Sequence, residues 1–449
     1  MKITFIMPSV GKVKGRSYIR SWQMEPLTIA TLAGLTPGDV ETRFIDDRIE
    51  EVTYDDLPDL AAINCETYTA GRAYSISSQY KKRGVPVVLG GFHPTLMPEE
   101  AAMFADSVVI GEAEGVWGQV IEDAKRHRIQ KTYRSNRRPG LERISPDRSI
   151  FKGKKYLPVT LVESSRGCKF NCRFCSITNY FKASCNYRPI GDIVKELAGI
   201  KKKGIFFVDD NVASSPDRAK DLFREIASLG IKWIGQGSIN MAKDRGLIGL
   251  MKKSGCLGLL VGLESLDPAN LELMGKRWNG DDGGFKEALK VFRDNGIVIY
   301  GTFVFGYDND DADSFKRALD FALEQKFFLA AFNHLVPFPG TPLYDEMKKD
   351  GRLLYDKWWL EPDNKFGDVV FTPKRMSAKQ LSERCFEARK KFFSAQSIIK
   401  RSLDFDSNCR NSEMMAYFFS INLFSGREVE KRQGWPLGVA YEENRRFCI

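Results

Sequence analysis

The chain has 449 residues, of which 43% are hydrophobic and 12% aromatic, which is enough for two or three domains with apolar cores. Its net charge is +10, but the basic residues occur in short runs typical of solvated helix ends, which argues against a nucleic-acid partner. No stretch approaches the roughly 18 apolar residues of a membrane span, and the apolar run before Pro8 is too short for a signal peptide. We expect a soluble, cytoplasmic protein.

Apolar runs alternate with helical patterns through residues 1–136. The expected strands are 3–7, 40–45, 60–63, 85–89 and 108–110. This alternation predicts an α/β domain with a doubly wound, Rossmann-like parallel sheet. Ligands of such sheets bind beyond the carboxyl ends of the strands.

Glycines and polar residues follow the last two of these strands. The candidates are Gly90, Gly91, His93, Thr95 and Glu112. Glycine lets the backbone approach a bulky ligand closely. His93 is a candidate ligand contact, with a turn cap as the alternative.

Residues 137–152 are polar and contain two prolines, which predicts a linker. Six strand-like runs follow, separated by helical patterns, at 159–162, 205–208, 233–236, 258–261, 298–305 and 328–335. They predict an open, partial (β/α)6 barrel over residues 153–345, with its chemistry at the carboxyl ends of the strands. Residues 346–449 predict a helical C-terminal extension that closes the open side of the barrel.

Three cysteines, Cys168, Cys172 and Cys175, lie in one short loop directly after the first barrel strand. Zinc is a poor alternative because no histidine lies near this loop. Disulfide bonds are a still poorer alternative, because nine cysteines scattered along the chain are typical of a protein in a reducing compartment. Three thiols with the spacing CxxxCxxC can instead bind three corners of a 4Fe-4S cluster and leave the fourth iron open, whereas ferredoxins close all four corners.

This loop, with the aromatic Phe174 before its last cysteine, resembles the radical S-adenosylmethionine (SAM) superfamily. The resemblance implies that SAM binds the open iron. It also implies that one electron from the cluster cleaves SAM and releases a 5′-deoxyadenosyl radical. It also implies an external one-electron reductant such as flavodoxin or ferredoxin.

The resemblance also implies which residues position SAM, together with Phe174. They lie at the ends of strands two to four, namely Asp209, Asp210, Gln236, Gly262 and Glu264. Carboxylates there can accept a hydrogen bond from the SAM ammonium group. An N-cap of the next helix is the alternative role for the aspartates.

The N-terminal third is similar to the cobalamin-binding domain of cobalamin-dependent radical SAM enzymes, through Gly-Gly-x-His-x-Thr and then Gly-Glu-x-Glu-Gly. The resemblance implies that Gly90, Gly91, His93, Thr95 and Glu112 line a corrin pocket. The DxHxxG motif, which supplies a histidine to cobalt, is absent. A domain that has lost its cofactor remains the alternative.

Rims rich in proline and glycine follow strands five and six. Tyr307, Asp308 and His334 are the candidates there for substrate contact or proton transfer, with a structural role as the alternative.

These observations together favour a cobalamin-dependent radical SAM transferase that methylates, or otherwise modifies, an unactivated carbon of a small metabolite or natural-product intermediate. A second hypothesis is transfer of the 3-amino-3-carboxypropyl group of SAM, for example to arsenite. RNA modification ranks lower, because the domain before the three-cysteine loop has only Cys65 for a second cluster. A sensor that carries a cluster is the non-enzymatic alternative.

Overall fold

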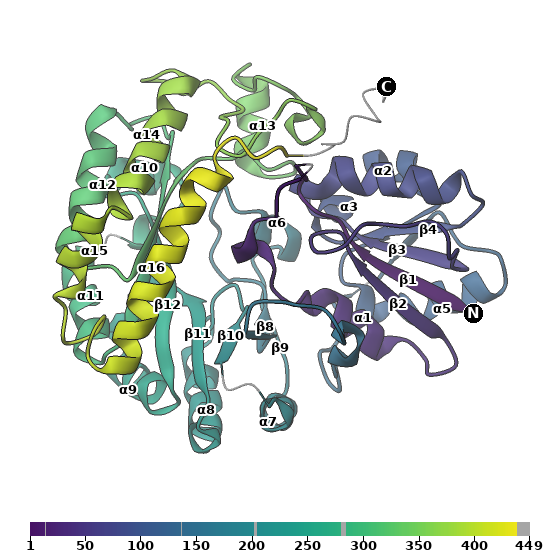
Figure 1. The fold of residues 1–449 in the computed structure, drawn as a ribbon, viewed down its shortest axis with the longest axis horizontal. Helices are drawn as coiled ribbons and strands as arrows, with labels where there is room; N and C mark the ends of the chain where they lie inside the picture. The colour runs from purple at the N-terminus through teal and green to yellow at the C-terminus, as the bar shows by residue number, and fades with distance from the viewer. Residues whose placement is uncertain (14, 136, 202–203, 280–283, 438–449) are drawn as a thin grey trace. The chain divides into compact units, whose positions relative to one another are not determined.

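The computed structural model describes residues 1–437 apart from 14, 136, 202–203 and 280–283 (Figure 1). The chain forms two compact units. The first contains Met1–Leu157, Tyr355–Phe366 and the segment from Trp435, and the second contains Pro158–Leu354 and Gly367–Gly434.

The boundaries differ from the predicted ones in two places. The predicted linker 137–152 belongs to the first unit, because Leu141, Ile144 and Phe151 are buried in it. The predicted extension 346–449 is divided between the units, because Trp358 and Trp359 bury their rings in the first unit. Residues 438–449 of that extension lie outside the described residues.

The first unit is built on a parallel sheet with the order β2-β1-β3-β4-β5-β6. Its strands are β1 (Lys2–Met7), β2 (Glu41–Asp46), β3 (Leu60–Asn64), β4 (Val87–Gly90), β5 (Ser107–Ile110) and β6 (Thr132–Arg134). The order changes direction between β1 and β3, so the ligand crevice of such a sheet is expected at the carboxyl ends of these two strands.

Five helices accompany this sheet among the described residues of the first unit. They are α1 (Leu27–Leu35), α2 (Ala70–Lys81), α3 (Phe92–Leu96), α4 (Pro98–Phe104) and α5 (Trp117–Lys125). Side chains of the strands pack with Ile29, Trp117, Val120 and Ile121 in one core. The predicted doubly wound fold of this part of the chain is therefore confirmed.

The second unit contains a six-stranded parallel sheet with the order β14-β13-β12-β11-β10-β7. Its strands are β7 (Thr160–Val162), β10 (Gly204–Phe207), β11 (Lys232–Gly237), β12 (Cys256–Glu264), β13 (Val298–Phe305) and β14 (Leu329–His334). Each strand pairs with the next strand of the barrel along the chain, and no described residues pair β7 with β14. The predicted partial (β/α)6 barrel is confirmed.

Helices follow the barrel strands and pack on their outer face. They are α6 (Ser176–Phe181), α7 (Ile190–Gly199), α8 (Pro216–Ile226), α9 (Arg245–Lys253), α10 (Pro268–Leu273), α11 (Gly284–Asp294), α12 (Ala312–Glu324) and α13 (Pro342–Lys349). The shared core contains Phe207 and Trp233 from strands and Phe223, Ile248 and Phe292 from helices.

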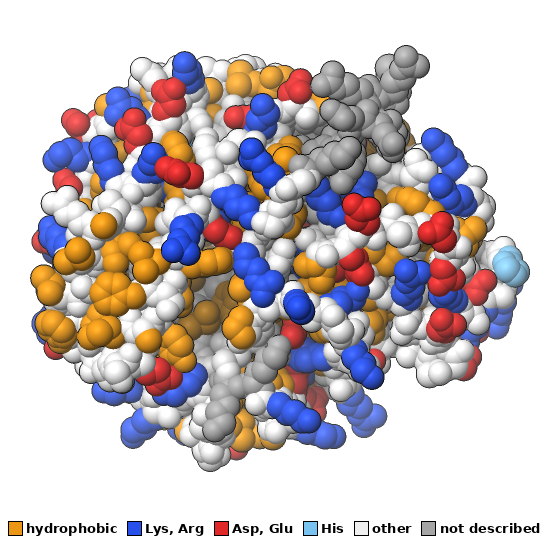
Figure 2. All heavy atoms as spheres, in the orientation of Figure 1, with side chains coloured by type: hydrophobic (Ala, Val, Ile, Leu, Met, Phe, Trp, Pro, Cys, Tyr) orange, Lys and Arg blue, Asp and Glu red, His pale blue; other side chains and the backbone are white. Residues whose placement is uncertain are grey.

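The C-terminal part of the second unit consists of α14 (Ala378–Phe392), α15 (Ala395–Ser402) and α16 (Ser412–Arg432). Hydrophobic side chains gather on the surface over α15 and α16 (Figure 2), and Ile399, Leu403 and Leu423 are more than half exposed there. Among the described residues, no helix has both the length and the apolar character that crossing a membrane requires.

Candidate active site

The three predicted cluster ligands lie in an excursion from the barrel that is closed at its base. The short strands β8 (Ser165–Arg166) and β9 (Asn186–Tyr187) pair antiparallel on either side of the loop and of α6. Cys168, Cys172 and Cys175 all have free, partly exposed thiols. The structure therefore brings the three predicted ligands together on one loop.

The surroundings of the thiols act on their pKa values in two opposite directions. Burial raises the pKa of Cys175, and the backbone N–H groups of Thr178 and Ile177 at the start of α6 oppose this rise. Burial raises the pKa of Cys172 to about 12, and the nearby charge of Lys276 opposes it. In a cubane each cysteine binds a different iron, so the thiols need not converge on one ion. The donor set fits a 4Fe-4S cluster with one open corner.

The segment after α10 braces the cluster loop from one side. The rings of Phe170 and Trp278 stack with centroids 3.8 Å apart. The backbone N–H of Arg173 donates to the carbonyl of Met274 at 3.0 Å. These contacts involve protein groups alone, so we expect the loop to keep its shape before the cluster is assembled.

The two aspartates after β10 bind the chain that leads into the cluster loop. Asp209 is completely buried, and it accepts hydrogen bonds from Ser164 and Ser165 through both carboxylate oxygens. Burial raises the pKa of Asp209, and these bonds oppose the rise. Asp209 thus presents no exposed oxygen to SAM, contrary to the sequence-based expectation. Asp210 accepts from the Gly167 N–H at 2.8 Å and is partly exposed, so its predicted role stays a prediction.

Glu264 ends β12 in a strained conformation, with φ at +65° and a register shift relative to β13. Its carboxylate pairs with the Lys276 amine at 2.8 Å, and both side chains are about nine-tenths buried. The predicted contact of Glu264 with SAM therefore competes with an ion pair. The sequence analysis missed Lys276, because it lies 12 residues from its partner on a loop without a motif.

Gly262 lies directly beneath this ion pair. A Cβ atom at this position would lie 2.1 Å from the Glu264 Oε1 and 2.8 Å from the Lys276 Nζ. We expect Gly262→Ala to lower the free energy of unfolding by about 1–3 kcal/mol, because the pair must move. Gly249→Ala in α9, where a Cβ meets nothing within 4 Å, is the control and should leave stability unchanged or raise it. Urea unfolding of both variants measures this, and equal effects would contradict the explanation.

The three rim candidates follow β13 and β14 but differ in their surroundings. The Tyr307 hydroxyl is buried and has no hydrogen-bond partner among the described residues, and its ring meets Phe174 edge-on. Asp308 pairs with Arg352 and Lys374 at 3.0 and 2.7 Å. Burial lowers the pKa of His334 to about 4, so this imidazole is neutral at pH 7. Tyr307 is the candidate that keeps an unused polar group.

The inner face of the barrel wall is largely apolar, and its exposure varies from strand to strand. Side chains alternate along β10 and β11, so that Phe207 and Trp233 pack on the outer helices while Phe206 and Ile234 face the barrel interior. Leu260, Tyr300 and Leu329 continue this inner face on β12 to β14, in paired register. Ile234 is 41% exposed. This face is therefore exposed at Ile234 on β11, whereas at Leu329 on β14 it packs against Ile398 and Phe418 of the C-terminal helices.

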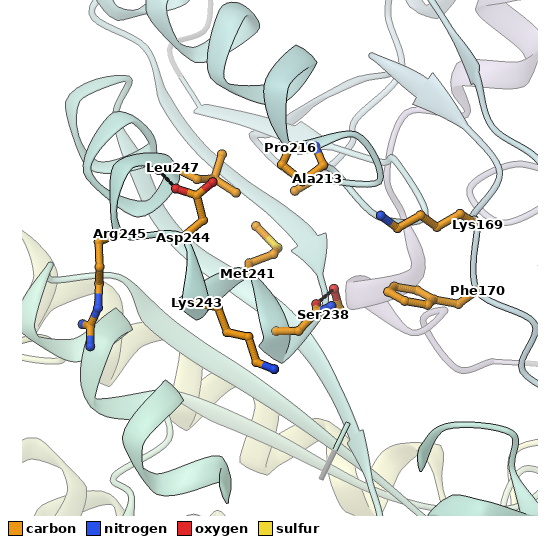
Figure 3. A pocket seen from close by; sticks show the side chains of 11 residues that line it. Lys169, Phe170, Ala213, Pro216, Ser238, Met241, Lys243, Asp244, Arg245 and Leu247 are labelled. Atoms are coloured by element: carbon orange, nitrogen blue, oxygen red, sulfur yellow. Dashed lines mark hydrogen bonds between the residues drawn. The ribbon is translucent and has the colours of Figure 1, made fainter. Parts of the chain in front are cut away.

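Gln236 lies at the carboxyl end of β11 with its side chain on this same inner face, partly exposed. Beside it, a cavity of about 550 Å³ lies between the cluster loop and the starts of α8 and α9 (Figure 3). Lys169 and Phe170 form one wall and Ser238, Met241 and Lys243 form the opposite wall. The sequence analysis did not identify this cavity.

In the first unit, the residues predicted to line a corrin pocket lie at the carboxyl ends of β4 and β5. Gly91 has φ of +114°, and a Cβ there would approach the Cys65 carbonyl to 2.8 Å. Thr95 accepts from the Gly111 N–H at 2.9 Å. Glu112 is buried and pairs with Arg138 at 2.6 Å. Gly91 is therefore needed for close packing against the chain after β3, and Thr95 and Glu112 bind protein groups.

His93 is completely buried, contrary to the expectation that it lines a ligand pocket. Its Nε2 lies 3.0 Å from Glu100, which also accepts from Tyr74 and from Trp359 at 3.0 and 2.9 Å. Lys357 adds an ion pair at 3.2 Å. The sequence analysis missed this cluster around Glu100, because Trp359 lies 259 residues from Glu100 in the chain.

At the crevice between β1 and β3, the described side chains include no exposed histidine. Glu66 follows β3 there, and burial raises its pKa to about 7. Asp47 accepts from the Ser9 backbone N–H and pairs with Arg72 and Lys12. Polar groups and close-approaching backbone fit the periphery of a corrin, but the site offers no imidazole for the cobalt.

We therefore expect cobalamin bound to this protein to have no histidine on its cobalt. The EPR spectrum of the cob(II)alamin form should be insensitive to labelling of the protein with ¹⁵N-histidine, because His93 is held by Glu100 inside the core. A change of the nitrogen splitting on labelling, lost again in His93→Gln, would contradict this expectation.

Two family profiles match the chain. The profile of the radical SAM superfamily matches residues 162–322, and that of the B12 binding domain matches residues 25–121. The first runs from the end of β7 into α12, includes the cluster loop and stops before β14. The second covers most of the first sheet.

The chain is 30% identical over 391 residues to the bacteriochlorophyllide d C-12(1)-methyltransferase of Chlorobaculum tepidum, with 84% of each protein covered. It is 25% identical to the hopanoid C-2 methylase of Rhodopseudomonas palustris, with 78% of this chain and 68% of that protein covered.

Two solved structures share the fold. The radical SAM methyltransferase TsrM from Kitasatospora setae, with cobalamin and a 4Fe-4S cluster bound, superposes with a TM-score of 0.62, covering 78% of each chain at 15% identity. The cobalamin-dependent SAM radical enzyme OxsB, with aqua-cobalamin bound, has a TM-score of 0.66 and 14% identity, covering 96% of this chain and 72% of that chain.

Proposed function

Because this chain belongs to the radical SAM superfamily, in the group that carries a B12-binding domain, we propose that it transfers a methyl group to an unactivated carbon of an apolar small molecule. The enzyme uses a 4Fe-4S cluster, SAM and cobalamin. Cys168, Cys172 and Cys175 hold the cluster in this proposal. When bound, the cluster and SAM would supply an adenosyl radical for abstraction of a substrate hydrogen, and cobalamin would supply the methyl group.

The open apolar interior of the barrel carries the proposal for the acceptor. Phe206, Ile234 and Leu260 present hydrocarbon surface, and small-molecule sites are lined mainly by such side chains with a few polar groups at the mouth. The two relatives described above are named for bacteriochlorophyllide and for hopanoid, which are both largely apolar. The acceptor that we propose for this chain is therefore an apolar molecule with several rings.

Tyr307 is the rim residue that best fits contact with the substrate or with SAM. Its buried hydroxyl has no partner in the part of the chain that the structure describes, and leaving such a group unpaired costs about 1–3 kcal/mol. A bound ligand that hydrogen-bonds this hydroxyl would recover part of that cost. Asp210, Gln236 and Gly262 remain the candidates for positioning SAM.

The proposal includes an external one-electron donor of the flavodoxin or ferredoxin type. It also includes a cytoplasmic location, which agrees with eight free cysteines among the described residues.

The test uses protein reconstituted anaerobically with iron, sulfide and cobalamin, and SAM with a deuterated methyl group. Bacteriochlorophyllide d and a hopanoid are the first acceptors, with equilibrium binding and product mass as readouts. We expect Ile234→Glu to abolish acceptor binding and methylation while 5′-deoxyadenosine still forms. Ile399→Glu, at a site 60% exposed on α15, is the control.

Three outcomes would contradict the proposal. Methylthioadenosine as the product of SAM would indicate 3-amino-3-carboxypropyl transfer. Unchanged binding of apolar acceptors by Ile234→Glu, or binding of neither acceptor by the wild-type protein, would remove the barrel interior as an apolar site.

A further inference from the structure

The helix α16 packs one face on the barrel and exposes another face that carries apolar side chains. On the packed face, Phe418 meets the ring of Phe328 edge-on at 5.4 Å, and Asn422 donates to the Phe328 carbonyl at 3.1 Å. The large apolar side chains exposed on this helix are Met415, Tyr417, Ile421, Leu423 and Phe424. They belong to the hydrophobic surface over α15 and α16 in Figure 2. A contiguous exposed apolar surface of this kind marks a docking site.

The exposed face of α16 has the spacing of a helix-pairing seam. Glu413, Ser420 and Arg427 follow one another at intervals of seven residues, so they lie on one line along the helix, and all three are exposed. Ala416 and Leu423 continue this line between them. The small side chains of Ala416 and Ser420 allow a second helix to approach closely, because the distance between packed helices depends on the side chains at the contact.

This line is complementary to its own reverse. Ser420 lies midway between Glu413 and Arg427, so a two-fold axis at Ser420 would place the carboxylate of each copy beside the guanidinium of the other. The same axis would place Tyr417 of one copy opposite Leu423 of the second copy. In a parallel pair each Glu413 would instead face a second Glu413, and like charges would repel. The charges therefore favour an antiparallel pair of identical helices.

Both end charges are accessible for this contact. Arg427 is exposed and forms no ion pair with the residues that the structure describes. The side chain of Glu413 is half exposed; it accepts from the Tyr417 hydroxyl at 3.1 Å and lies 3.9 Å from the Lys232 amine, which is longer than a hydrogen bond. A carboxylate has about four acceptor positions, so Glu413 can also accept from a guanidinium of a second copy.

We propose that α16 is a dimerisation helix, which packs antiparallel against α16 of a second copy of this chain around a two-fold axis at Ser420. The apolar side chains supply the affinity, and the two Glu413–Arg427 pairs set the direction and register. One pair of helices makes a small interface, so we expect a dissociation constant on the order of micromolar. The inference does not depend on the cofactors or on the methyl acceptor.

The test measures self-association of the full chain, reconstituted with its cofactors, by sedimentation velocity at about 1–100 µM protein. Glu413→Arg and Arg427→Glu, each alone, bring like charges together at both ends of the symmetric interface, so each should weaken association at least about tenfold. The double variant Glu413→Arg/Arg427→Glu restores opposite charges and should recover it. Lys316→Glu on α12, which is 77% exposed, is the control and should associate like the wild type.

A further variant, Leu423→Glu, places a charge in the apolar part of the seam. Because this side chain is 51% exposed, the variant should keep its urea-unfolding midpoint and sediment as a monomer. A wild-type protein that is monomeric at every concentration, or single charge variants that associate like the wild type, would overturn the proposal. Failure of the double variant to recover association would overturn it as well. A monomer that binds phosphatidylglycerol vesicles, with binding lost in Leu423→Glu, would overturn it in favour of a membrane-docking surface.

Discussion

Cys172→Ala is expected to abolish the reductive cleavage of SAM, with a fall of more than about 1000-fold in 5′-deoxyadenosine formation. With two thiols the loop can hold only two corners of the cluster, and the thiol that is lost is the one next to Lys276. The absorption of the cluster and its iron content, measured after anaerobic reconstitution and desalting, should fall in parallel with activity.

Cys185→Ala is the matched control for this variant. Cys185 is also a partly exposed free thiol, and it lies near the base of the same excursion, 3.5 Å from the Gly167 carbonyl. We expect this variant to keep the cluster and the activity. If Cys172→Ala retained a full cluster, or if Cys185→Ala lost it, the assignment of the three ligands would have to be revised.

The second large effect concerns stability. Glu100→Ala should lower the free energy of unfolding of the first unit by about 3–5 kcal/mol, because it leaves the buried donors of Tyr74, His93 and Trp359 without an acceptor. The loss should also release the segment Tyr355–Phe366, which Trp359 and Lys357 attach to Glu100. Urea unfolding and limited proteolysis of this segment measure the two consequences.

The effect of Glu100→Ala should depend on pH. Burial alone would raise the pKa of Glu100, but hydrogen bonds from His93, Trp359 and Tyr74 lower it to about 2. A depressed pKa stabilises the folded state above the unfolded value of about 4.3, and this contribution is lost as the pH falls toward 2. The difference between wild type and variant should therefore be largest above pH 5 and shrink below pH 4.

Glu99→Ala, at the exposed neighbouring position, is the control and should change stability by less than about 0.5 kcal/mol at any pH. A pH-independent loss in Glu100→Ala would mean that the side chain acts through packing and not through its charge.

The sequence was sufficient to predict both parallel sheets, because their strands are continuous apolar runs separated by helical periodicity. The predicted strand 3–7 and β1 (Lys2–Met7) differ by one residue, whereas the predicted strand 258–261 is shorter than β12 (Cys256–Glu264) and the short edge strand β6 (Thr132–Arg134) was not predicted. The three cluster cysteines were also predictable, because ligands from a single loop are set by local spacing. Such features depend on residues that are close in the chain.

The remaining site residues could not be predicted in the same way. Asp209 and His93 are of the right chemical type and lie at the right strand ends, yet both are buried with protein partners. Residue type and strand position do not determine whether a polar side chain contacts a ligand or another protein group, because this depends on which elements pack against it. Lys276 pairs with Glu264 and Trp359 donates to Glu100, and both come from segments without a motif.

The amino-acid sequence by itself determined the two α/β folds, the order of the domains and the three thiols, since hydrophobic period and local spacing are properties of neighbouring residues. Only the tertiary structure decided which carboxylates are already paired, that Trp359 returns to the first unit, and that the barrel interior is open at Ile234. It also brought Lys169 and Lys243 to one cavity. These features join residues that are distant along the chain, and their proximity follows from how the elements pack.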